Sequence, residues 1–140
     1  MKQIQKQLVL LNDIQEIEKL TLFLDEIGEE LSLSPELKFN LCLALEEAVS
    51  NVIMYAYPGQ SGCEIKLEVT SDAQMLMFVL TDSGMAFDPT QVPDANVNLS
   101  VEERPIGGLG IFLIRKIMDE VSYQRINGQN RLVLKKVLAV

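Results

Sequence analysis

The chain has 140 residues, of which 48% are hydrophobic and 23% charged, so it is long enough for one domain with its own core and too apolar for extensive disorder. A formal net charge of −8 argues against direct binding to nucleic acid or to an anionic membrane, and suits either a basic partner or plain solubility. The chain contains no histidine, which excludes imidazole metal sites and histidine-based catalytic triads.

The cysteines and the apolar segments of the sequence indicate the cellular compartment of the protein. Cys42 and Cys63 lie in different predicted elements and form neither a CxxC pair nor a disulfide framework, as expected in a reducing cytoplasm. The first residues lack a long apolar segment with a cleavage site, and no run approaches 18 consecutive apolar residues. We therefore expect a cytoplasmic protein that is neither exported nor inserted in a membrane.

The first part of the chain predicts a strand over residues 3–11 and then two helices. Ser34-Pro35-Glu36 offers an N-cap, a proline at the first helical position and an acidic residue in the first turn, so the second helix is expected over residues 35–55. The first helix is expected over residues 13–31, where apolar residues recur at helical spacing: Ile14, Ile17, Leu20, Leu24, Ile27 and Leu31.

Two strands should follow, over residues 64–70 and 75–81, because both segments are rich in β-formers and a turn signal separates them. Residues 82–110 are rich in Gly, Pro, Asn, Asp and Ser. A loop of this length inside a compact domain is usually functional, so this segment is expected to be a ligand-site lid.

The last part of the chain predicts a helix over residues 111–119 and two strands, 121–125 and 132–138, that flank Asn127-Gly128, a strong hairpin signal. No internal repeat interrupts this order. The sequence therefore predicts a single α+β domain over residues 1–140, folded as a two-layer α/β sandwich with helices on one face of a sheet.

The second predicted helix carries a candidate polar site. Glu47 and Asn51 are four residues apart and project from the same helix face. A solvated helix face is the simpler explanation for such a pair taken alone. An apolar stripe that can pack on the sheet runs along a separate face of this helix: Leu37, Leu41, Leu45, Ala48 and Val52.

A second candidate follows the apolar strand that ends in Asp82-Ser83-Gly84. A carboxylate at the rim of a sheet can accept a hydrogen bond from a ligand amino group, and Gly84 would let the backbone approach the ligand closely. A plain strand-to-loop turn explains the same residues equally well.

A third candidate is the glycine run Gly107-Gly108-Leu109-Gly110 that opens a helix. Uncovered backbone N–H groups at the positive end of a helix dipole form a phosphate-binding arrangement. The run matches neither a P-loop nor a Rossmann motif. A flexible hinge is the alternative, although glycine is costly in a helical turn unless backbone exposure is useful.

Together, in this order and spacing, the three motifs resemble the N, G1 and G2 boxes of the GHKL ATPases. The short form of the chain is similar to the serine kinases that act as anti-sigma factors, and the resemblance covers essentially the whole chain. It implies a histidine kinase-like (Bergerat) fold, with a mixed sheet covered by helices on one face, and a site for ATP and Mg²⁺.

The resemblance also implies roles for the polar residues. Asn51 would bind the Mg²⁺ that bridges the phosphates, and Glu47 would orient or deprotonate the attacking hydroxyl. Glu46 is adjacent to Glu47 but points elsewhere, and receives a lesser role. Arg104, ahead of the glycine run, would stabilise the charge of the transferred phosphoryl group.

For the nucleotide itself, the resemblance implies that Asp82 accepts a hydrogen bond from the adenine 6-amino group, that Gly84 admits the ring and that Phe87 contacts the nucleotide. Guanine carries a carbonyl at this position and would be rejected. The terminal hairpin departs from the family, because a threonine is frequent where this chain has Gly128-Gln129-Asn130. The phosphates would be held by the backbone of Gly107, Gly108, Leu109 and Gly110.

The first functional hypothesis is a serine protein kinase and anti-sigma factor. The resemblance implies as partners an anti-anti-sigma (STAS-type) protein that carries the acceptor serine and a sigma factor, with the kinase as a homodimer. The alternative is an ATP-binding partner-switch module without phosphotransfer. A histidine kinase domain is disfavoured because the chain has no phosphoacceptor histidine, and a purely structural domain would require the three motifs to be coincidental.

Overall fold

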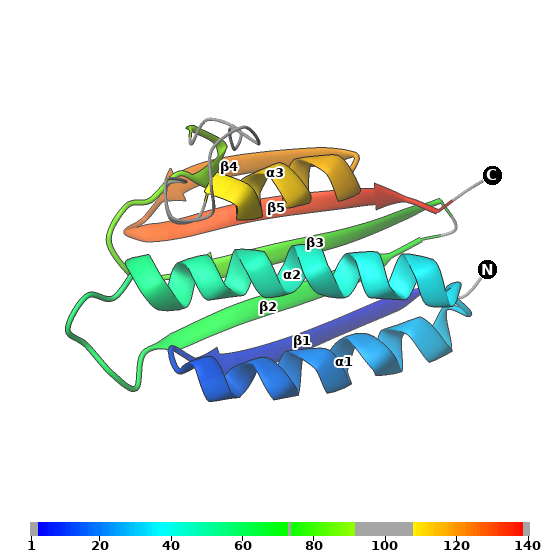
Figure 1. Ribbon diagram of the computed structural model, residues 1–140, viewed down its shortest axis with the longest axis horizontal. Helices are drawn as coiled ribbons and strands as arrows, with labels where there is room; N and C mark the ends of the chain where they lie inside the picture. The colour runs from blue at the N-terminus through cyan, green and yellow to red at the C-terminus, as the bar shows by residue number, and fades with distance from the viewer. Residues whose placement is uncertain (1–2, 73, 92–107, 139–140) are drawn as a thin grey trace.

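The computed structural model describes residues 3–72, 74–91 and 108–138, with side chains of the last segment described from residue 111. Within these residues, three α-helices cover one face of a five-stranded sheet (Figure 1). The strands are β1 (Ile4–Leu11), β2 (Glu64–Ser71), β3 (Met75–Asp82), β4 (Glu120–Ile126) and β5 (Gln129–Val137). The helices are α1 (Ile17–Glu30), α2 (Pro35–Tyr55) and α3 (Gly108–Ile117), with short 3₁₀ segments η1 (Ile14–Glu16) and η2 (Pro89–Gln91).

The sheet has the strand order β1-β2-β3-β5-β4, and each neighbouring pair is antiparallel. The α+β class and the two layers are confirmed, but the expectation of a mixed sheet is wrong. The chain returns from α3 into β4 at the edge of the sheet, and the tight hairpin then places β5 against β3. Insertion of β5 keeps the codirectional strands β3 and β4 apart, so no parallel pair forms.

Of the two long helices, α2 begins where the sequence predicts and α1 begins later. The Ser34 hydroxyl accepts a hydrogen bond from the Leu37 N–H at 3.1 Å, and α2 runs over the predicted residues. The first helix is different, because the Asp13 carboxylate caps the 3₁₀ turn η1 by accepting from the Gln15 N–H. Ile14 is therefore outside the helical stripe to which it was assigned, and is 60% exposed.

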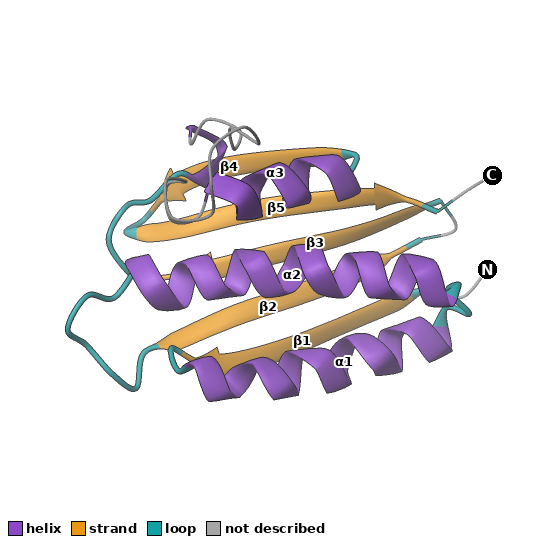
Figure 2. Cartoon of the chain, in the orientation of Figure 1, coloured by secondary structure: helices purple, strands orange, loops and turns teal. Residues whose placement is uncertain are grey.

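The core lies between the helices and the face of the sheet that they cover, and Figure 2 shows the helices lying over this face. Alternate residues of each central strand point into it, as a strand with one buried face requires. The other face carries partly exposed side chains such as Lys66, Glu68 and Arg131. The largest fully buried side chains are Phe78, Leu10, Leu20, Ile27, Leu45, Ile65, Leu67, Leu76, Leu80, Ile111, Ile114 and Leu134.

The turns agree with the sequence where they are described. Asn127 and Gly128 both have positive φ, 51° and 76°, as the two-residue hairpin between β4 and β5 requires.

Of the predicted lid, residues 82–91 and 108–110 are described, whereas residues 92–107 lie outside the described part. The last predicted helix begins at Gly108 rather than at residue 111. None of the helices described is long and apolar enough to cross a membrane.

Truncation of Leu45, a fully buried residue of α2, should lower the free energy of unfolding by about 2–5 kcal/mol, because Leu45→Ala leaves a cavity against the sheet. Leu22 of α1 is 65% exposed, and Leu22→Ala should change stability by less than about 0.5 kcal/mol. Urea unfolding midpoints would measure both, and equal losses in the two variants would contradict this description of the core.

Candidate functional site

A cavity of about 20 Å³ lies between α2, α3 and the ends of β3 and β5. Its walls are mainly apolar, with a few convergent polar groups, which is the usual composition of a small-molecule site. The volume is close to that of one water molecule, so a larger ligand would require the lining to move. The lining residues are Ala48, Asn51, Val52, Ala56, Leu80, Asp82, Phe87, Pro89, Ile114, Tyr123, Asn130 and Leu132.

Asn51 is only 4% exposed and lines the cavity from α2, so it does not belong to a solvated helix face. No hydrogen bond links its carboxamide to another residue in the described part of the chain. The amide can therefore form hydrogen bonds with a molecule in the cavity, and this unused bonding capacity calls for an explanation. A ligand that binds the amide is the simplest one.

Glu47 lies one helical turn before Asn51 and is half-buried, but it is not among the residues that line the cavity. Its neighbour Glu46 faces α1 and accepts a hydrogen bond from the Thr21 hydroxyl at 3.2 Å. The structure thus brings Asn51 to the cavity, whereas Glu47 is not part of the cavity lining.

Asp82, the last residue of β3, is also 4% exposed. Its Oδ1 accepts from the Gly84 N–H and from Asn130 Nδ2, both at 2.9 Å, whereas no described residue donates to Oδ2. Burial raises the pKa of this carboxyl above its ordinary value, and the hydrogen bonds from Asn130 and Gly84 and the charge of Arg125 oppose that rise.

Gly84 has a role in packing that the sequence did not reveal. A Cβ atom added to it would lie 2.6 Å from the Ala56 Cβ and closer still to the Ala56 carbonyl oxygen. That oxygen accepts from the Met85 N–H at 2.8 Å, so the loop after β3 is held against the end of α2. The Tyr57 hydroxyl strengthens this junction by accepting from the Ser83 N–H at 2.7 Å and donating to the Glu64 carbonyl.

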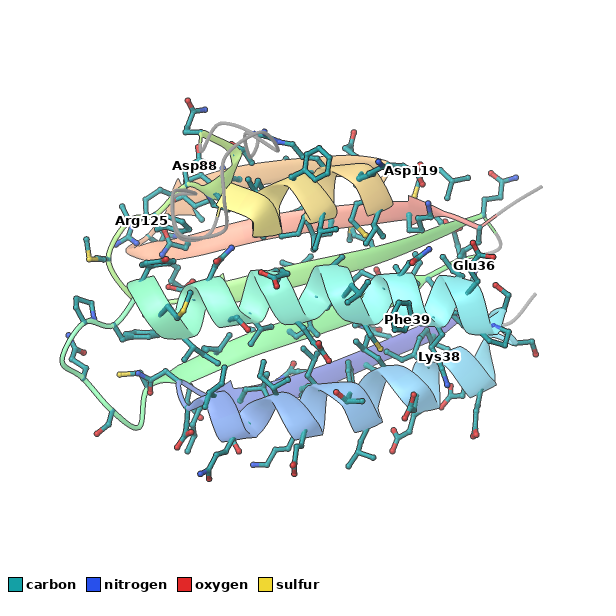
Figure 3. The ribbon with its side chains drawn as sticks, in the orientation of Figure 1. Glu36, Lys38, Phe39, Asp88, Asp119 and Arg125 are labelled. Carbon is teal, nitrogen blue, oxygen red and sulfur yellow. The ribbon has the colours of Figure 1, made fainter. Side chains whose placement is uncertain are left out.

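Phe87 lines the cavity, and its ring stacks on Tyr55 with the centroids 5.4 Å apart. The Tyr55 hydroxyl is buried and has no hydrogen-bond partner among the described residues. Beyond Phe87, Asp88 caps the 3₁₀ segment η2 through Thr90, whose carbonyl accepts from Arg115 of α3. Figure 3 shows Asp88 and Arg125 at the same end of the sheet.

The other predicted residues are in or beside the lid. Arg104 and Gly107 lie outside the described residues. Gly108, Leu109 and Gly110 form the first turn of α3. Figure 1 shows that α3 begins at the end of the sheet where α2 ends, and Ile114 carries the same helix to the cavity wall.

Sequence reasoning gave no role to Asn130, Tyr123 or Arg125, although all three surround Asp82 or its partners. Asn130 lies directly opposite Asp82 in the β3–β5 register. One signal could have found it. Asn130 shares the inward face of its strand with Leu132 and Leu134, and a polar residue at the start of such an apolar series indicates a buried polar contact.

Comparisons with known proteins define the class. Residues 10–136 match the family model of the histidine kinase-like ATPase domain. The chain therefore belongs to this family of ATP-binding domains, the GHKL ATPases, and its sheet and helices are consistent with the Bergerat fold.

Two proteins of similar sequence and one solved structure of similar fold give a more specific comparison than the family model. The chain is 31% identical over 112 residues to the serine/threonine-protein kinase BtrW of Bordetella bronchiseptica, covering 80% of this chain and 79% of BtrW. It is 29% identical over 120 residues to the serine-protein kinase RsbW of Listeria monocytogenes, covering 83% and 76% of the two chains. A chain of the SiaB-SiaC complex from Pseudomonas aeruginosa has the same fold, with a TM-score of 0.58, 14% identity and coverage of 94% and 89%.

Replacement of Gly84 tests whether this position requires glycine because of close packing or because of backbone flexibility. Gly84→Ala must displace the backbone of Ala56, and overpacking of this kind costs about 1–3 kcal/mol of folding free energy. In Gly28→Ala, the new Cβ meets only the flexible stem of Lys38, and the gain in helix propensity should offset that contact. Thermal unfolding would compare the two, and a stable Gly84→Ala variant would show that the junction is not tight.

Proposed function

We propose that this chain binds Mg-ATP in the cavity at the end of α2 and β3, and transfers the γ-phosphoryl group to a serine of a partner protein. One observation carries the proposal. Two polar groups that line an apolar cavity, the Asn51 carboxamide and the Oδ2 atom of Asp82, have no partner among the described residues. Their residue types suit a metal-bound polyphosphate and an amino group respectively.

Asp82 is the proposed adenine contact. With Oδ1 already engaged, Oδ2 would accept from the exocyclic amino group of the base, while Phe87 and the aliphatic lining would contact its ring. A base with a carbonyl at this position would set two acceptors against each other, so the site should favour adenine. Gly84 would serve the base indirectly, because it fixes the loop that follows Asp82.

Asn51 is the proposed protein ligand of Mg²⁺. No group of three or more Cys, Asp or Glu side chains gathers as a metal site in the described ranges. Mg²⁺ often keeps several waters and takes only one or two protein ligands together with substrate phosphates. A single neutral oxygen from Asn51 fits that pattern, and bound Mg²⁺ would neutralise charge on the phosphates.

Glu47 is the proposed base. In the transfer step, the serine hydroxyl oxygen forms a bond to the γ-phosphorus, the bond to the bridging oxygen breaks, and ADP leaves with the electron pair. Glu47 would take the hydroxyl proton. The backbone of Gly107 and of residues 108–110, the latter in the first turn of α3, would hold the phosphates, and Arg104 would stabilise their charge.

Two relatives of the chain, BtrW and RsbW, are named as a serine/threonine-protein kinase and a serine-protein kinase, which supports transfer to serine. By the resemblance described above, the acceptor would be an anti-anti-sigma (STAS-type) protein, and the chain would also bind a sigma factor, as a homodimer in the cytoplasm. An ATP-dependent partner switch without phosphotransfer is the alternative, and the catalytic test below distinguishes the two.

Saturating Mg-ATP should raise the midpoint of thermal unfolding by several degrees, because a ligand present at 100 times its Kd stabilises the native state by about 2.7 kcal/mol. Asn51→Ala and Asp82→Asn should each lose most of this shift. Asn40→Ala is the matched control, since Asn40 lies on the same helix outside the cavity. No shift in the wild type at millimolar Mg-ATP would reject nucleotide binding.

Glu47→Gln should keep the Mg-ATP shift but lose about 10²-fold or more of phosphotransfer, because it removes the proton acceptor and no cavity-lining group. Glu46→Gln, which alters only the contact with α1, should remain active. Transfer of label from γ-labelled ATP to serine in a native extract would be measured. Binding without any serine labelling by the wild type would favour the switch without phosphotransfer.

A further inference from the structure

Among the described residues, Asn130 has the most hydrogen-bonded polar side chain at this end of the sheet. It is 5% exposed, lies on β5 directly opposite Asp82, and belongs to the face of the sheet that the helices cover. Its carboxamide makes contacts with two strands and with the loop after β3. The proposed function gives it no role.

The oxygen of the Asn130 carboxamide faces donors from three sides. Oδ1 accepts from the Tyr123 hydroxyl at 2.5 Å, from Arg125 Nη1 at 3.2 Å and from the Phe87 N–H at 3.3 Å. Arg125 is itself anchored, because its Nη1 also donates to the Gly84 carbonyl at 2.7 Å. The oxygen end of the amide is therefore held in an environment of donors only.

The nitrogen of the same carboxamide faces acceptors. Nδ2 donates to Asp82 Oδ1 at 2.9 Å and to the Met85 carbonyl at 2.8 Å. Rotation of the amide by half a turn would place its oxygen against these two acceptors and its amino group against the guanidinium and N–H donors. The surroundings thus allow one orientation, in which Asn130 always presents a donor to Asp82.

This contact determines which oxygen of Asp82 remains for a ligand. Oδ1 receives both Asn130 and the Gly84 N–H, so Oδ2 is the oxygen without a partner among the described residues. The hydrogen bond also favours the ionised carboxyl against the effect of burial. A carboxylate held in this way can only accept hydrogen bonds.

We propose that Asn130 is the positioning residue for base selectivity: it holds Asp82 as an acceptor with Oδ2 left for the exocyclic amino group of a purine. This inference rests on the proposed binding of ATP. It predicts that a change at Asn130 alters which base is bound and at which pH, rather than stability alone.

Asn130→Asp tests the inference most directly, because it keeps the shape and replaces the donor by a second carboxyl. Two adjacent carboxyls share a proton. The donors around the oxygen of residue 130 favour an ionised carboxyl there, so Asp82 should be the carboxyl that keeps the proton, up to a higher pH than in the wild type. Among the described residues, the other titratable or charged groups near Asp82 are Arg125 and Tyr123 of β4 and the Tyr57 hydroxyl, and none of them changes in this variant.

The measurement is equilibrium binding of Mg-ATP and of Mg-ITP, which carries a carbonyl in place of the amino group, across pH 5 to 9. The wild type should prefer ATP. Asn130→Asp should bind ATP at least about tenfold more weakly, lose the preference over ITP, and lose ATP binding at a higher pH as the pH falls. Gln129→Ala, a change at the exposed neighbouring residue, should leave the ratio and the pH profile unchanged.

A second variant protects the test against misfolding of the first. Arg125→Met removes an exposed side chain that anchors Asn130 and should lower the ATP preference about threefold in the same direction. Arg131→Met removes the same charge from the open face of the sheet and should have no effect. Unchanged ATP/ITP ratios and pH profiles in the folded variants would overturn the role of Asn130. A wild type that binds neither nucleotide would overturn the proposed function, and this inference with it.

Discussion

The buried carboxylate of Asp82 is the constraint on which this end of the molecule depends. A charge removed from water is strongly unfavourable unless hydrogen bonds and opposite charge compensate it. Here the compensation comes from three places: the Gly84 N–H in the next loop, the Asn130 carboxamide on β5, and the Arg125 guanidinium on β4. The carboxylate is thus compatible with burial only when β3 and β5 are paired in their observed register.

The same pairing connects the sheet to α2. Gly84 follows Asp82 and packs against the backbone of Ala56, and the Tyr57 hydroxyl bridges this loop to the start of β2. These contacts fix the end of α2 relative to the end of β3, and so bring Asn51 and Asp82 to one cavity although they are distant in sequence. Backbone packing, rather than flexible side chains, therefore fixes the separation of the two residues that a bound ligand would contact.

Much of the fold follows from local signals. The hydroxyl of Ser34 and the ring of Pro35 start α2, and Asn127-Gly128 closes the last hairpin, because capping and turn geometry depend on a few adjacent residues. Local signals failed where two competed. Ile14 has the helical spacing of the stripe, but the Asp13 cap holds it in a separate 3₁₀ turn. Local signals also could not predict the strand order, because β4 lies at the edge of the sheet only if β5 pairs with β3.

The features of the site, like those of the fold, divide into those that the sequence predicts and those that only the tertiary structure decides. Sequence alone determined the candidates Glu47, Asn51, Asp82 and the glycine run, because motif order and residue chemistry are properties of the chain. Only the tertiary structure decided that Asn51 is buried without a described partner, that Gly84 is required by the approach of Ala56, and that Asn130 orients Asp82. The physical reason is that burial and hydrogen bonding belong to pairs of groups, and the partners of Asp82 and Gly84 lie on strands and helices that only the folded sheet brings together.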